Sequence, residues 1–500
     1  MIVDIARAVE RQPLHGVAAT RRIEATARVS LPAHALMRSA GEAVARVAMA
    51  IAPVARSAWV ICGQGNNGGD GFEAALVLHR AGWRVHVTDL GLPERRPADA
   101  RASRERAAIA GLSIGPGAPG FQAQIVIDAL LGIGVTRAPG PDYQWAIELF
   151  NAFAGPRLAV DLPSGLDADR GVVVGGSAVV ATDTVSLLTL KPGLLTAAGR
   201  DHAGRLWLDE LGAGLARRDE PPDAWTVGRL DVDAVRGPRP HASHKGSYGD
   251  VLAIGGAPGM SGAITLAARA ALASGAGRVY VCALDSSARA ADPCWPELMV
   301  KSWSAALAPA NHTIVAGCGG GDRIGEALPW ILSRARRLVL DADALNAIAG
   351  DAALQTQLAQ RAARGLHTVL TPHPLEAARL LGLDSAAAVQ GDRLTSARTL
   401  AQRFDCTVLL KGSGTVIAAP GQAPAINTTG NARLSTAGSG DVLAGWLAGL
   451  WSSMRFNESA SAAFDAARAA AFEHGAAAEV QEPARRPLTA SALLARLSRD

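Results

Sequence analysis

One acid, Asp441, stands between two contrasting stretches of the sequence. Small residues lead up to it in Leu434-Ser-Thr-Ala-Gly-Ser-Gly, and the apolar run Val442–Trp451 follows at once. The glycines allow positive φ and close backbone approach, and the first amides of a helix that begins here would bind an anion. A carboxylate repels a phosphate, so Asp441 is better placed to take a proton from a hydroxyl that attacks phosphorus. The alternative is a plain N-cap aspartate after a flexible loop.

Lysine is scarce in this chain and marks a second candidate. Of 49 Lys and Arg residues, only Lys191, Lys245, Lys301 and Lys411 are lysine. Because this chain otherwise uses arginine, a remaining lysine is interpreted as one whose compact ammonium group cannot be replaced by a guanidinium. Lys411-Gly-Ser-Gly-Thr415 is therefore interpreted as a phosphate cradle that accompanies Asp441.

A glycine-rich turn, Gly63-Gln-Gly-Asn-Asn-Gly-Gly-Asp-Gly71, lies inside a βαβ unit of the first half. Its glycines match G-x-G-x-x-G, and Asp89 follows at about the distance typical of a Rossmann dinucleotide site. Asn66, Asn67 and Asp70 favour another use. An acid at the helix start would repel a diphosphate, whereas carboxamide oxygens suit a cation or a polar ligand.

Acidic and polar residues also follow two later strands, Ile125–Asp128 and Leu158–Asp161. Ligands of open α/β sheets lie outside the carboxyl ends of strands. One such acid alone would be interpreted as a loop aspartate that bonds its own backbone. Several at successive strand ends predict a shared site with oxygen ligands, which favour a hard cation such as Mg²⁺ or an alkali ion. The residues expected at that face are Asn67, Asp70, Asp128, Asp161 and Ser164.

The elements that position these residues form two series. Helices are expected over residues 11–50, a helix over Phe72–Arg80, and a strand over Trp83–Thr88. From about Trp225, strand–loop–helix units recur to the end, which predicts a mostly parallel sheet. The Gly- and Pro-rich stretch between the series is expected to be a linker. The boundaries are 1–216 for the first domain, 217–226 for the linker and 227–500 for the second.

Composition limits the classes of function. The 500 residues are 49% hydrophobic and 19% charged, with a formal net charge of +4. Such a chain builds cores, and no basic run tracks a nucleic-acid backbone. No apolar run reaches the roughly 20 residues that span a bilayer, and five scattered cysteines favour a reducing compartment. The expectation is a cytoplasmic protein with neither a nucleic-acid nor a membrane partner, and a homo-oligomer.

Three motifs of the first half resemble the signature of NAD(P)H-hydrate epimerases: the turn at residues 63–71, Asp128-Ala-Leu-Leu-Gly, and Val160-Asp-Leu-Pro-Ser-Gly. The resemblance covers about residues 10–210. It implies a potassium ion held by Asn67, Asp128 and Ser164, and Asp161 as the acid/base. The family usually has Thr where Ile133 stands. The residues implied to contact the hydrated nucleotide are Asn66, Asn67, Gly68, Gly69, Asp70, Gly132, Ile133, Gly134, Val135, Thr136, Arg137, Ala138 and Asp161.

Five ordered motifs of the second half resemble ADP-dependent NAD(P)H-hydrate dehydratases, which are ribokinase-like. They are His244-Lys-Gly-Ser-Tyr-Gly, Asp341-Ala-Asp-Ala-Leu, Thr371-Pro-His-Pro, Leu410-Lys-Gly and Gly438-Ser-Gly-Asp-Val-Leu-Ala-Gly. The resemblance implies that Mg²⁺ accompanies ADP and that Ala263, Gly319, His373 and Asp441 contact the hydrate. Two departures are Gly317-Cys-Gly-Gly-Gly for the usual Gly-Pro-Gly-Leu-Gly, and Ser439 for the usual Thr. The residues implied to bind the adenine nucleotide are Lys411, Gly412, Ser413, Gly414, Thr415 and Gly440.

Together these resemblances imply a Rossmann-like three-layer α/β/α domain followed by a ribokinase-like α/β domain, in an enzyme that is both isomerase and lyase. It would epimerise the R and S forms of hydrated NADH and NADPH (NADHX and NADPHX). It would also dehydrate the S form at the expense of ADP, with release of AMP and phosphate.

Two other hypotheses remain open from the sequence. A ribokinase-like vitamin-precursor kinase fused to a Rossmann domain would share the anion hole and Asp441, but would leave Asn66 and Asn67 without a use. Alternatively, the first half is a binding or scaffolding module, against which Asp161 and the expected cation ligands stand.

Overall fold

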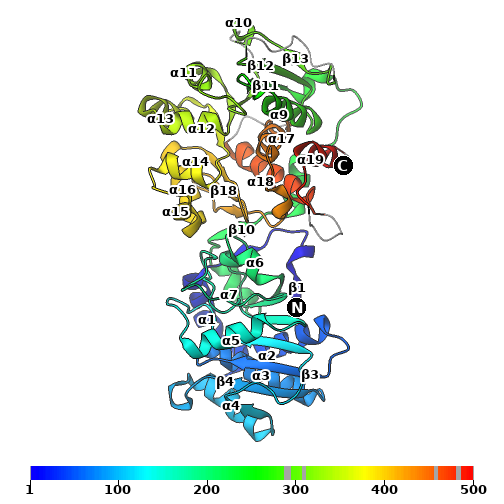
Figure 1. Cartoon of the computed structure of the whole chain (residues 1–500), viewed down its shortest axis with the longest axis vertical. Helices are drawn as coiled ribbons and strands as arrows, with labels where there is room; N and C mark the ends of the chain where they lie inside the picture. The colour runs from blue at the N-terminus through cyan, green and yellow to red at the C-terminus, as the bar shows by residue number, and fades with distance from the viewer. Residues whose placement is uncertain (1, 286–293, 307–310, 455–459, 480–485, 499–500) are drawn as a thin grey trace. The chain divides into compact units, whose positions relative to one another are not determined.

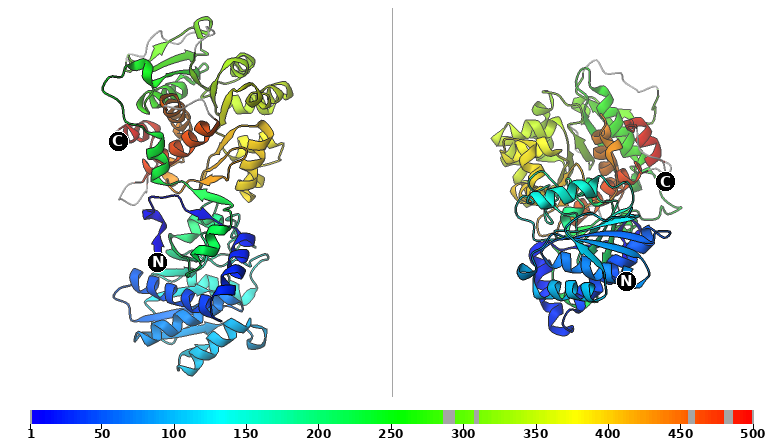
Figure 2. Two further views of the ribbon diagram at one scale, coloured as in Figure 1. Left: turned by 180° about the vertical axis from the view of Figure 1, so that it is seen from behind. Right: turned by 60° about the horizontal axis from the view of Figure 1, so that its bottom comes forward.

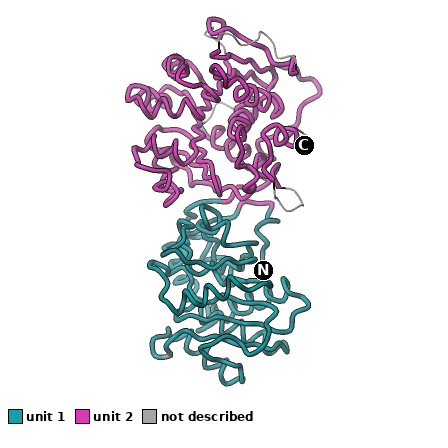
Figure 3. Tube along the Cα trace, viewed as in Figure 1, with its two compact units in different colours: residues 1–8, 12–225 teal, residues 9–11, 226–500 magenta. Residues whose placement is uncertain are grey.

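The computed structural model describes residues 2–285, 294–306, 311–454, 460–479 and 486–498. The chain forms two compact units, residues 1–8 with 12–225 and residues 9–11 with 226–500 (Figure 3). The expected linker is not free coil, because it includes the end of α7 (Gly214–Asp219) and the strand β10 (Ala224–Thr226). β10 pairs antiparallel with β2 (Pro13–Leu14).

The first unit is built on an eight-stranded sheet in the order β1-β9-β8-β7-β6-β3-β4-β5. Neighbouring strands run parallel except β1 and β9. β4 lies on one side of β3 and β6 lies on the other, so the strand order switches direction at β3, beside the glycine-rich turn. The strands are β1 (Ile2–Asp4), β3 (Ser57–Cys62), β4 (Arg84–Asp89), β5 (Ser113–Gly115), β6 (Ile125–Ala129), β7 (Arg157–Val160), β8 (Asp183–Leu187) and β9 (Arg205–Asp209).

Helices cover both faces of this sheet, as the alternation along β3 shows. Ala58, Val60 and Cys62 belong to the core formed with α1 to α4, whereas Trp59 and Ile61 belong to the core formed with α5. Successive side chains of a strand point to opposite faces, so the predicted three-layer α/β/α arrangement is confirmed (Figure 1). The helices are α1 (Val17–Ser30), α2 (Ala35–Ile51), α3 (Asn66–Arg80), α4 (Ala98–Ile109), α5 (Pro141–Asn151) and α6 (Gly199–Ala203).

The second unit has its own sheet, in the order β13-β12-β11-β14-β15-β16-β17-β18-β19. Pairs from β13 to β17 are parallel, as predicted, and β17, β18 and β19 are antiparallel. The strands are β11 (Asp250–Gly255), β12 (Arg278–Ala283), β13 (Met299–Val300), β14 (Thr313–Ala316), β15 (Arg337–Leu340), β16 (His367–Leu370), β17 (Thr407–Leu410), β18 (Val416–Ala418) and β19 (Ala425–Ile426).

Two groups of helices pack on this second sheet (Figures 1 and 2). α8 (Arg229–Val235), α9 (Ser261–Ala273), α17 (Ser439–Ser453), α18 (Ala460–Ala476) and α19 (Ala490–Leu497) share one core with alternate residues of β11 to β18. The remaining helices are α10 (Trp303–Ala306), α11 (Ile324–Arg334), α12 (Asp343–Ala349), α13 (Ala352–Ala359), α14 (Pro374–Leu381), α15 (Ala386–Gly391) and α16 (Arg393–Phe404).

The helix α17, which carries Asp441 in its first turn, packs very closely on α9. A Cβ added at Gly445 would lie 1.9 Å from the Ala267 carbonyl oxygen, and one at Gly449 would lie 2.1 Å from that of Ala271. Two glycines four residues apart therefore allow the two backbones to touch. None of the helices in the described ranges has the length and apolarity to cross a bilayer.

Candidate active sites

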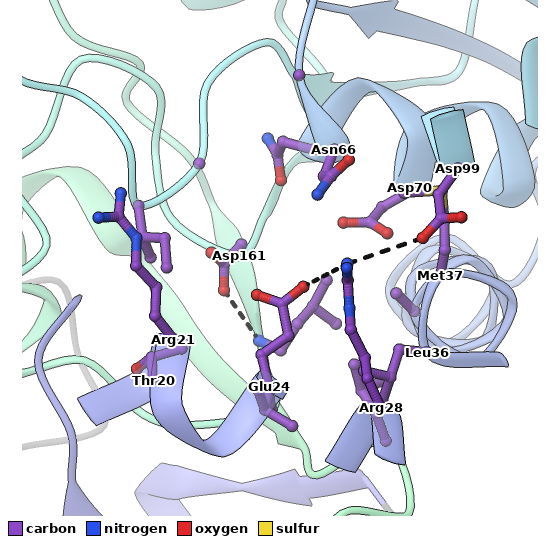
Figure 4. Close-up of a pocket in the computed structure, with 18 of the residues that line it drawn as sticks. Thr20, Arg21, Glu24, Arg28, Leu36, Met37, Asn66, Asp70, Asp99 and Asp161 are labelled. Carbon is purple, nitrogen blue, oxygen red and sulfur yellow. Dashed lines mark hydrogen bonds and ion pairs between the residues drawn. The ribbon is translucent and has the colours of Figure 1, made fainter. Parts of the chain in front are cut away.

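The first unit contains a cavity of about 740 Å³ among α1, the start of α2, the start of α3 and the loops after β6, β7 and β8 (Figure 4). Polar groups from these elements face the same space. The expected residues that line it are Asn66, Asn67, Asp70, Gly132, Ile133, Gly134 and Asp161. The remaining expected contacts, Gly68, Gly69, Val135, Thr136, Arg137 and Ala138, are not among the residues that line it.

The predicted start of α3 at Phe72 was wrong, because the helix begins at Asn66. None of the glycines from Gly63 to Gly71 has a positive φ. They are required by contact instead: a Cβ at Gly63 would lie 1.9 Å from the Leu130 carbonyl oxygen, and one at Gly68 would lie 2.1 Å from that of Gly63. The signature turn is thus the first turns of a helix pressed against the strand ends, which directs Asn66, Asn67 and Asp70 from helical positions.

Asp161 follows β7 directly and has φ of 70°, a conformation that is uncommon outside glycine and is concentrated at functional sites. Its Oδ1 accepts a hydrogen bond from the Leu187 amide at 3.2 Å and one from the Lys191 ammonium. Lys191 is only 1% exposed, and its Nζ also donates to the Leu187 carbonyl at 2.8 Å. The cavity therefore presents a carboxylate that is fixed in orientation and neutralised by a buried cation.

The expected cation ligands come from three elements: Asn67 lines the cavity from the start of α3, Asp128 lies in β6, and Ser164 follows β7. The Ser164 hydroxyl donates to Asp128 Oδ1 at 2.7 Å, and the Ser164 amide donates to Asp128 Oδ2 at 2.9 Å. Asn67 is 8% exposed, yet neither its Oδ1 nor its Nδ2 has a partner within the described ranges. Burial raises the pKa of Asp128 to about 6, although the hydrogen bonds from Ser164 and Leu130 oppose this. A buried amide without partners implies that something else completes its bonding.

Asp89, the acid at the Rossmann spacing, is held by two arginines. Its carboxylate is bound by the Arg96 guanidinium and by Arg104 at 2.7 Å, and its Oδ1 also accepts from the Gly91 amide at 3.1 Å. Its side chain is 7% exposed, and that of Arg96 is fully buried. Two arginines thus hold Asp89 in a buried position, which argues against its use as the ribose-binding acid of a dehydrogenase-like site.

The second site lies at the start of α17. The N-cap of this helix is Gly438, with φ of 84°, and Asp441 is the third helical residue, so the N-cap interpretation of Asp441 is wrong. Within the described residues, the Gly440 and Asp441 amides donate to no backbone acceptor, which leaves an anion-binding helix start. Burial raises the pKa of Asp441, and the charge of Asp341 raises it further, while the hydrogen bond with Cys318 opposes both.

Asp341, at the end of β15, gathers the polar groups of this second site. Its Oδ1 accepts from the Lys411 ammonium at 2.6 Å and from the Thr371 hydroxyl at 2.8 Å. Glu376 Oε2 lies 4.0 Å from the same Lys411 Nζ. Burial lowers the pKa of Lys411, but the two carboxylates outweigh it and the pKa is raised. The next residue, Ala342, has φ of 51°, so a strained residue stands at this strand end as well.

His373 is the N-cap of α14, and its Nδ1 accepts from the Leu375 and Glu376 amides at 3.1 and 3.3 Å. Its Nε2 lies 3.2 Å from Glu376 Oε1. Burial raises the pKa of Glu376 to about 7, against the opposing charge of Lys411. Both ring nitrogens of His373 thus contact the first turn of α14. Glu376 is part of the site, although it was not predicted from the sequence.

The loop Lys411–Thr415 turns through Gly412 and Gly414, with φ of 130° and 61°. Behind it, the buried Arg393 donates to the Leu410 and Lys411 carbonyls, both at 3.1 Å. Burial lowers the pKa of Arg393 to about 10. This guanidinium braces the loop through its carbonyls, and the Lys411 amide donates to the Pro372 carbonyl at 2.9 Å.

Two more of the expected residues touch one another. A Cβ added at Gly319, whose φ is 56°, would lie 2.9 Å from that of Ala263. Cys318 is buried beside them, and its sulfur lies within 4.8 Å of carboxylate oxygens of both Asp341 and Asp441. The second site therefore joins the ends of β14, β15, β16 and β17 to the start of α17.

Two family models match the chain. The model described as NAD(P)H-hydrate dehydratase matches residues 251–499, and the model described as YjeF-related protein N-terminus matches residues 33–193.

Curated relatives span both halves. A bifunctional NAD(P)H-hydrate repair enzyme of Escherichia coli K12 is 35% identical over 474 residues, which cover 91% of this chain and 87% of that protein. One of Leishmania braziliensis is also 35% identical, over 499 residues, and covers 91% and 86%. Among solved structures, the ADP/ATP-dependent NAD(P)H-hydrate dehydratase of Bacillus subtilis, co-crystallised with ATP and Mg²⁺, is 29% identical. It covers 54% of this chain and 94% of its own, with a TM-score of 0.43.

Proposed function

This chain belongs to the family of bifunctional NAD(P)H-hydrate repair enzymes, and we propose which of its residues carry each activity. The chain epimerises hydrated NADH and NADPH and dehydrates the hydrate at the expense of ADP. We assign epimerisation to residues 1–216 and dehydration to residues 227–500.

In the epimerase half, Asp161 is the acid/base that acts at C6 of the hydrated ring. The contacts that support this role are those with Lys191 and the Leu187 amide, because they fix one carboxylate toward the cavity. The residues proposed to contact the dinucleotide are Asn66, Asn67, Gly68, Gly69, Asp70 and the loop 132–138. Ile133 brings no hydroxyl, so the loop would use its backbone there.

Potassium is proposed to bind Asn67, Asp128 and Ser164. The unpartnered Asn67 amide supports this assignment, since its Oδ1 needs a partner and the other two residues add carboxylate and hydroxyl oxygens. Oxygen donors alone suit a hard cation. The ion would supply positive charge near the diphosphate, and the neighbouring residues would orient the nucleotide.

In the dehydratase half, Asp441 is the base for the C6 hydroxyl of the S hydrate. Deprotonation prepares that oxygen to take the terminal phosphoryl group of ADP, which makes AMP and turns a poor leaving group into a good one. Elimination of phosphate from C6, with loss of a proton from C5, then forms the C5=C6 double bond and restores the dihydropyridine ring of NAD(P)H. The free Gly440 and Asp441 amides support a place for the transferring phosphoryl group at the start of α17.

The loop Lys411–Thr415, together with Gly440, is proposed to bind the adenine nucleotide, and Ala263, Gly319 and His373 to contact the hydrate. A Cβ at Gly440 would lie 3.3 Å from Lys411 Nζ, so the ammonium lies close beside the helix start. Mg²⁺ is proposed to arrive with ADP and to balance phosphate charge. Asp341 and Asp441 offer oxygen ligands near it, although Asp341 already binds Lys411.

The observation that carries the assignment is that each half fixes one aspartate, Asp161 or Asp441, at a site formed by its own strand ends. The test is to incubate the whole chain with mixed R and S NADHX and ADP and to follow absorbance of NADH. Wild type should convert all of the hydrate. Asp161→Asn should stop after the S form, and Asp441→Asn should make no NADH. Equal conversion by all three proteins would refute both assignments.

A further inference from the structure

Besides Asp161, the epimerase cavity is lined by the carboxyl groups of Glu24, Asp70 and Asp99. Glu24 and Asp99 have charged partners, which leaves Asp70 as the candidate for a second chemical task. It lies in the second turn of α3 and lines the cavity opposite the loop that carries Asp161 (Figure 4). Within the described residues, Asp70 accepts no hydrogen bond and forms no ion pair, whereas Asp161 is bound by Lys191 and the Leu187 amide. Two carboxyl groups thus face one space with opposite surroundings.

The charges around Asp70 favour its neutral form. Burial raises the pKa of Asp70 well above its ordinary value, and the Asp161 carboxylate raises it further, followed by Glu24 and Glu73, while only Lys191 opposes them. The remaining charged groups of the cavity bind one another. Arg28 binds Glu24 at 2.7 Å and lies 3.7 Å from Asp99, which His34 approaches at 2.7 Å. Arg21 is the other cation that lines the cavity.

We propose that Asp70 is a second catalytic residue of the epimerase, which donates a proton to the hydroxyl that leaves C6 while Asp161 accepts the proton of the water that returns. This inference rests on the proposed function of the cavity. Two carboxyl groups in contrasting surroundings are the usual basis for an acid and a base in one site. Because they come from different walls of the cavity, they can serve opposite faces of the ring.

Asp70 transfers its proton to the C6 hydroxyl, the C6–O bond breaks with both electrons on oxygen, and water leaves. The lone pair of N1 forms an N1=C6 double bond, which makes C6 planar. Water then attacks the opposite face, the π electrons return to N1, and Asp161 takes the proton of the new hydroxyl. Solvent carries a proton from Asp161 back to Asp70, and in the reverse direction the two groups exchange roles.

The test compares full-length wild type with Asp70→Asn, Asp70→Glu, Asp161→Asn and a matched control, Asp142→Asn. Asp142 is an exposed acid in the first turn of α5, outside the cavity. R-to-S conversion of NADHX is followed by chromatography between pH 5 and 10, after subtraction of the uncatalysed rate. Circular dichroism of the same samples reports whether each chain is folded, and ADP-dependent dehydration of S-NADHX reports whether the second unit is intact.

An acid must be protonated, so the wild-type rate should fall on the alkaline side as Asp70 loses its proton. We expect Asp70→Asn to lower kcat about 10²-fold, with little change in KM and without that alkaline decline. Asp70→Glu should keep the decline at a shifted pH, and Asp142→Asn should match wild type.

Two results would overturn the role of Asp70: a kcat of Asp70→Asn close to that of wild type, or a lowered kcat with the alkaline decline unchanged. A wild-type rate in Asp161→Asn would instead refute the acid/base assignment of the proposed function, and the pairing of the two acids with it. Asp70→Glu guards against a folding artefact, because it keeps the carboxyl group.

Discussion

Each half of the chain buries one of its rare lysines against an aspartate at the end of a parallel strand. The two pairs differ in whether that aspartate is the proposed catalytic residue. In the first unit, Lys191 binds Asp161, the proposed acid/base itself. In the second unit, Lys411 binds Asp341, whereas the proposed base Asp441 lies in the first turn of α17 with Cys318 as its hydrogen-bond partner. Lys191 is 1% exposed and Lys411 is 19% exposed.

This difference indicates what each ammonium does. A lysine that is sealed against the catalytic carboxylate can only orient and neutralise it. A lysine that is anchored by two carboxylates and still reaches the surface of the site can present its charge to a phosphate. In the first unit, the lysine thus supports the catalytic carboxylate, whereas in the second unit the aspartate holds the lysine in place. The catalytic aspartate of the second unit therefore has a different neighbour, Cys318.

The largest expected effect separates the two sites outright. Asp161→Ala should lower epimerisation by about 10³-fold, because it removes the acid/base, and should leave ADP-dependent dehydration of S-NADHX at the wild-type rate. Both rates are measured on one sample, with circular dichroism as the control for folding. Loss of both activities in a folded chain would show that the sites are not independent.

Asp441→Asn should lower dehydration about 10²-fold, since an amide keeps the shape but cannot take a proton. Affinity for ADP should stay near wild type, or increase when a negative charge is removed beside a phosphate. Turnover is measured by NADH absorbance and affinity by calorimetry. If affinity falls and turnover does not, Asp441 is a ligand and another group is the base.

Replacing Lys191 or Lys411 by methionine should have different kinetic effects, because the two lysines are proposed to have different roles. Lys191→Met should lower kcat of epimerisation about tenfold with little change in KM, because a charged partner contributes roughly 1.5 to 3 kcal/mol. Lys411→Met should mainly raise the dissociation constant for ADP, and Lys411→Arg should not fully restore it, since a planar fork does not replace a compact ammonium. The same kinetic pattern in both variants would remove the comparison.

The smallest expected effect is a shift along the pH axis. The Cys318 thiol lowers the pKa of Asp441 by a hydrogen bond, so Cys318→Ala should raise that pKa. The ionised base would then appear only at higher pH, so the acid limb of the dehydration rate should move to higher pH, and at a fixed pH on that limb the rate should fall about threefold. Cys282→Ala, a buried cysteine of β12 outside the site, is the matched control and should leave the limb in place.

Sequence reasoning predicted the parallel sheets and the convergence of Asn67, Asp70 and Asp161 at one face, because strand ends and acids follow local patterns. It misplaced the start of α3, since glycine was interpreted as a turn former although these glycines are required by contact with Gly63 and Leu130.

The partners of the key groups were not predicted. Lys191 lies 30 residues from Asp161 and Lys411 lies 70 residues from Asp341, and no local pattern encodes such distances. Glu376 and Arg393 were missed for the same reason. The scarcity of lysine indicated that Lys191 and Lys411 are special, but it did not indicate which residues they bind.

The contact between α17 and α9 has a consequence for how this protein can vary among individuals and species. Gly445 and Gly449 touch carbonyl oxygens of α9 and lie one and two helical turns beyond Asp441. A change as small as glycine to serine at either position would push the two helices apart and carry the start of α17 with them. Such an allele would keep every residue of the active site and still lose the repair of hydrated cofactor, so a survey of active-site residues alone would classify it as harmless.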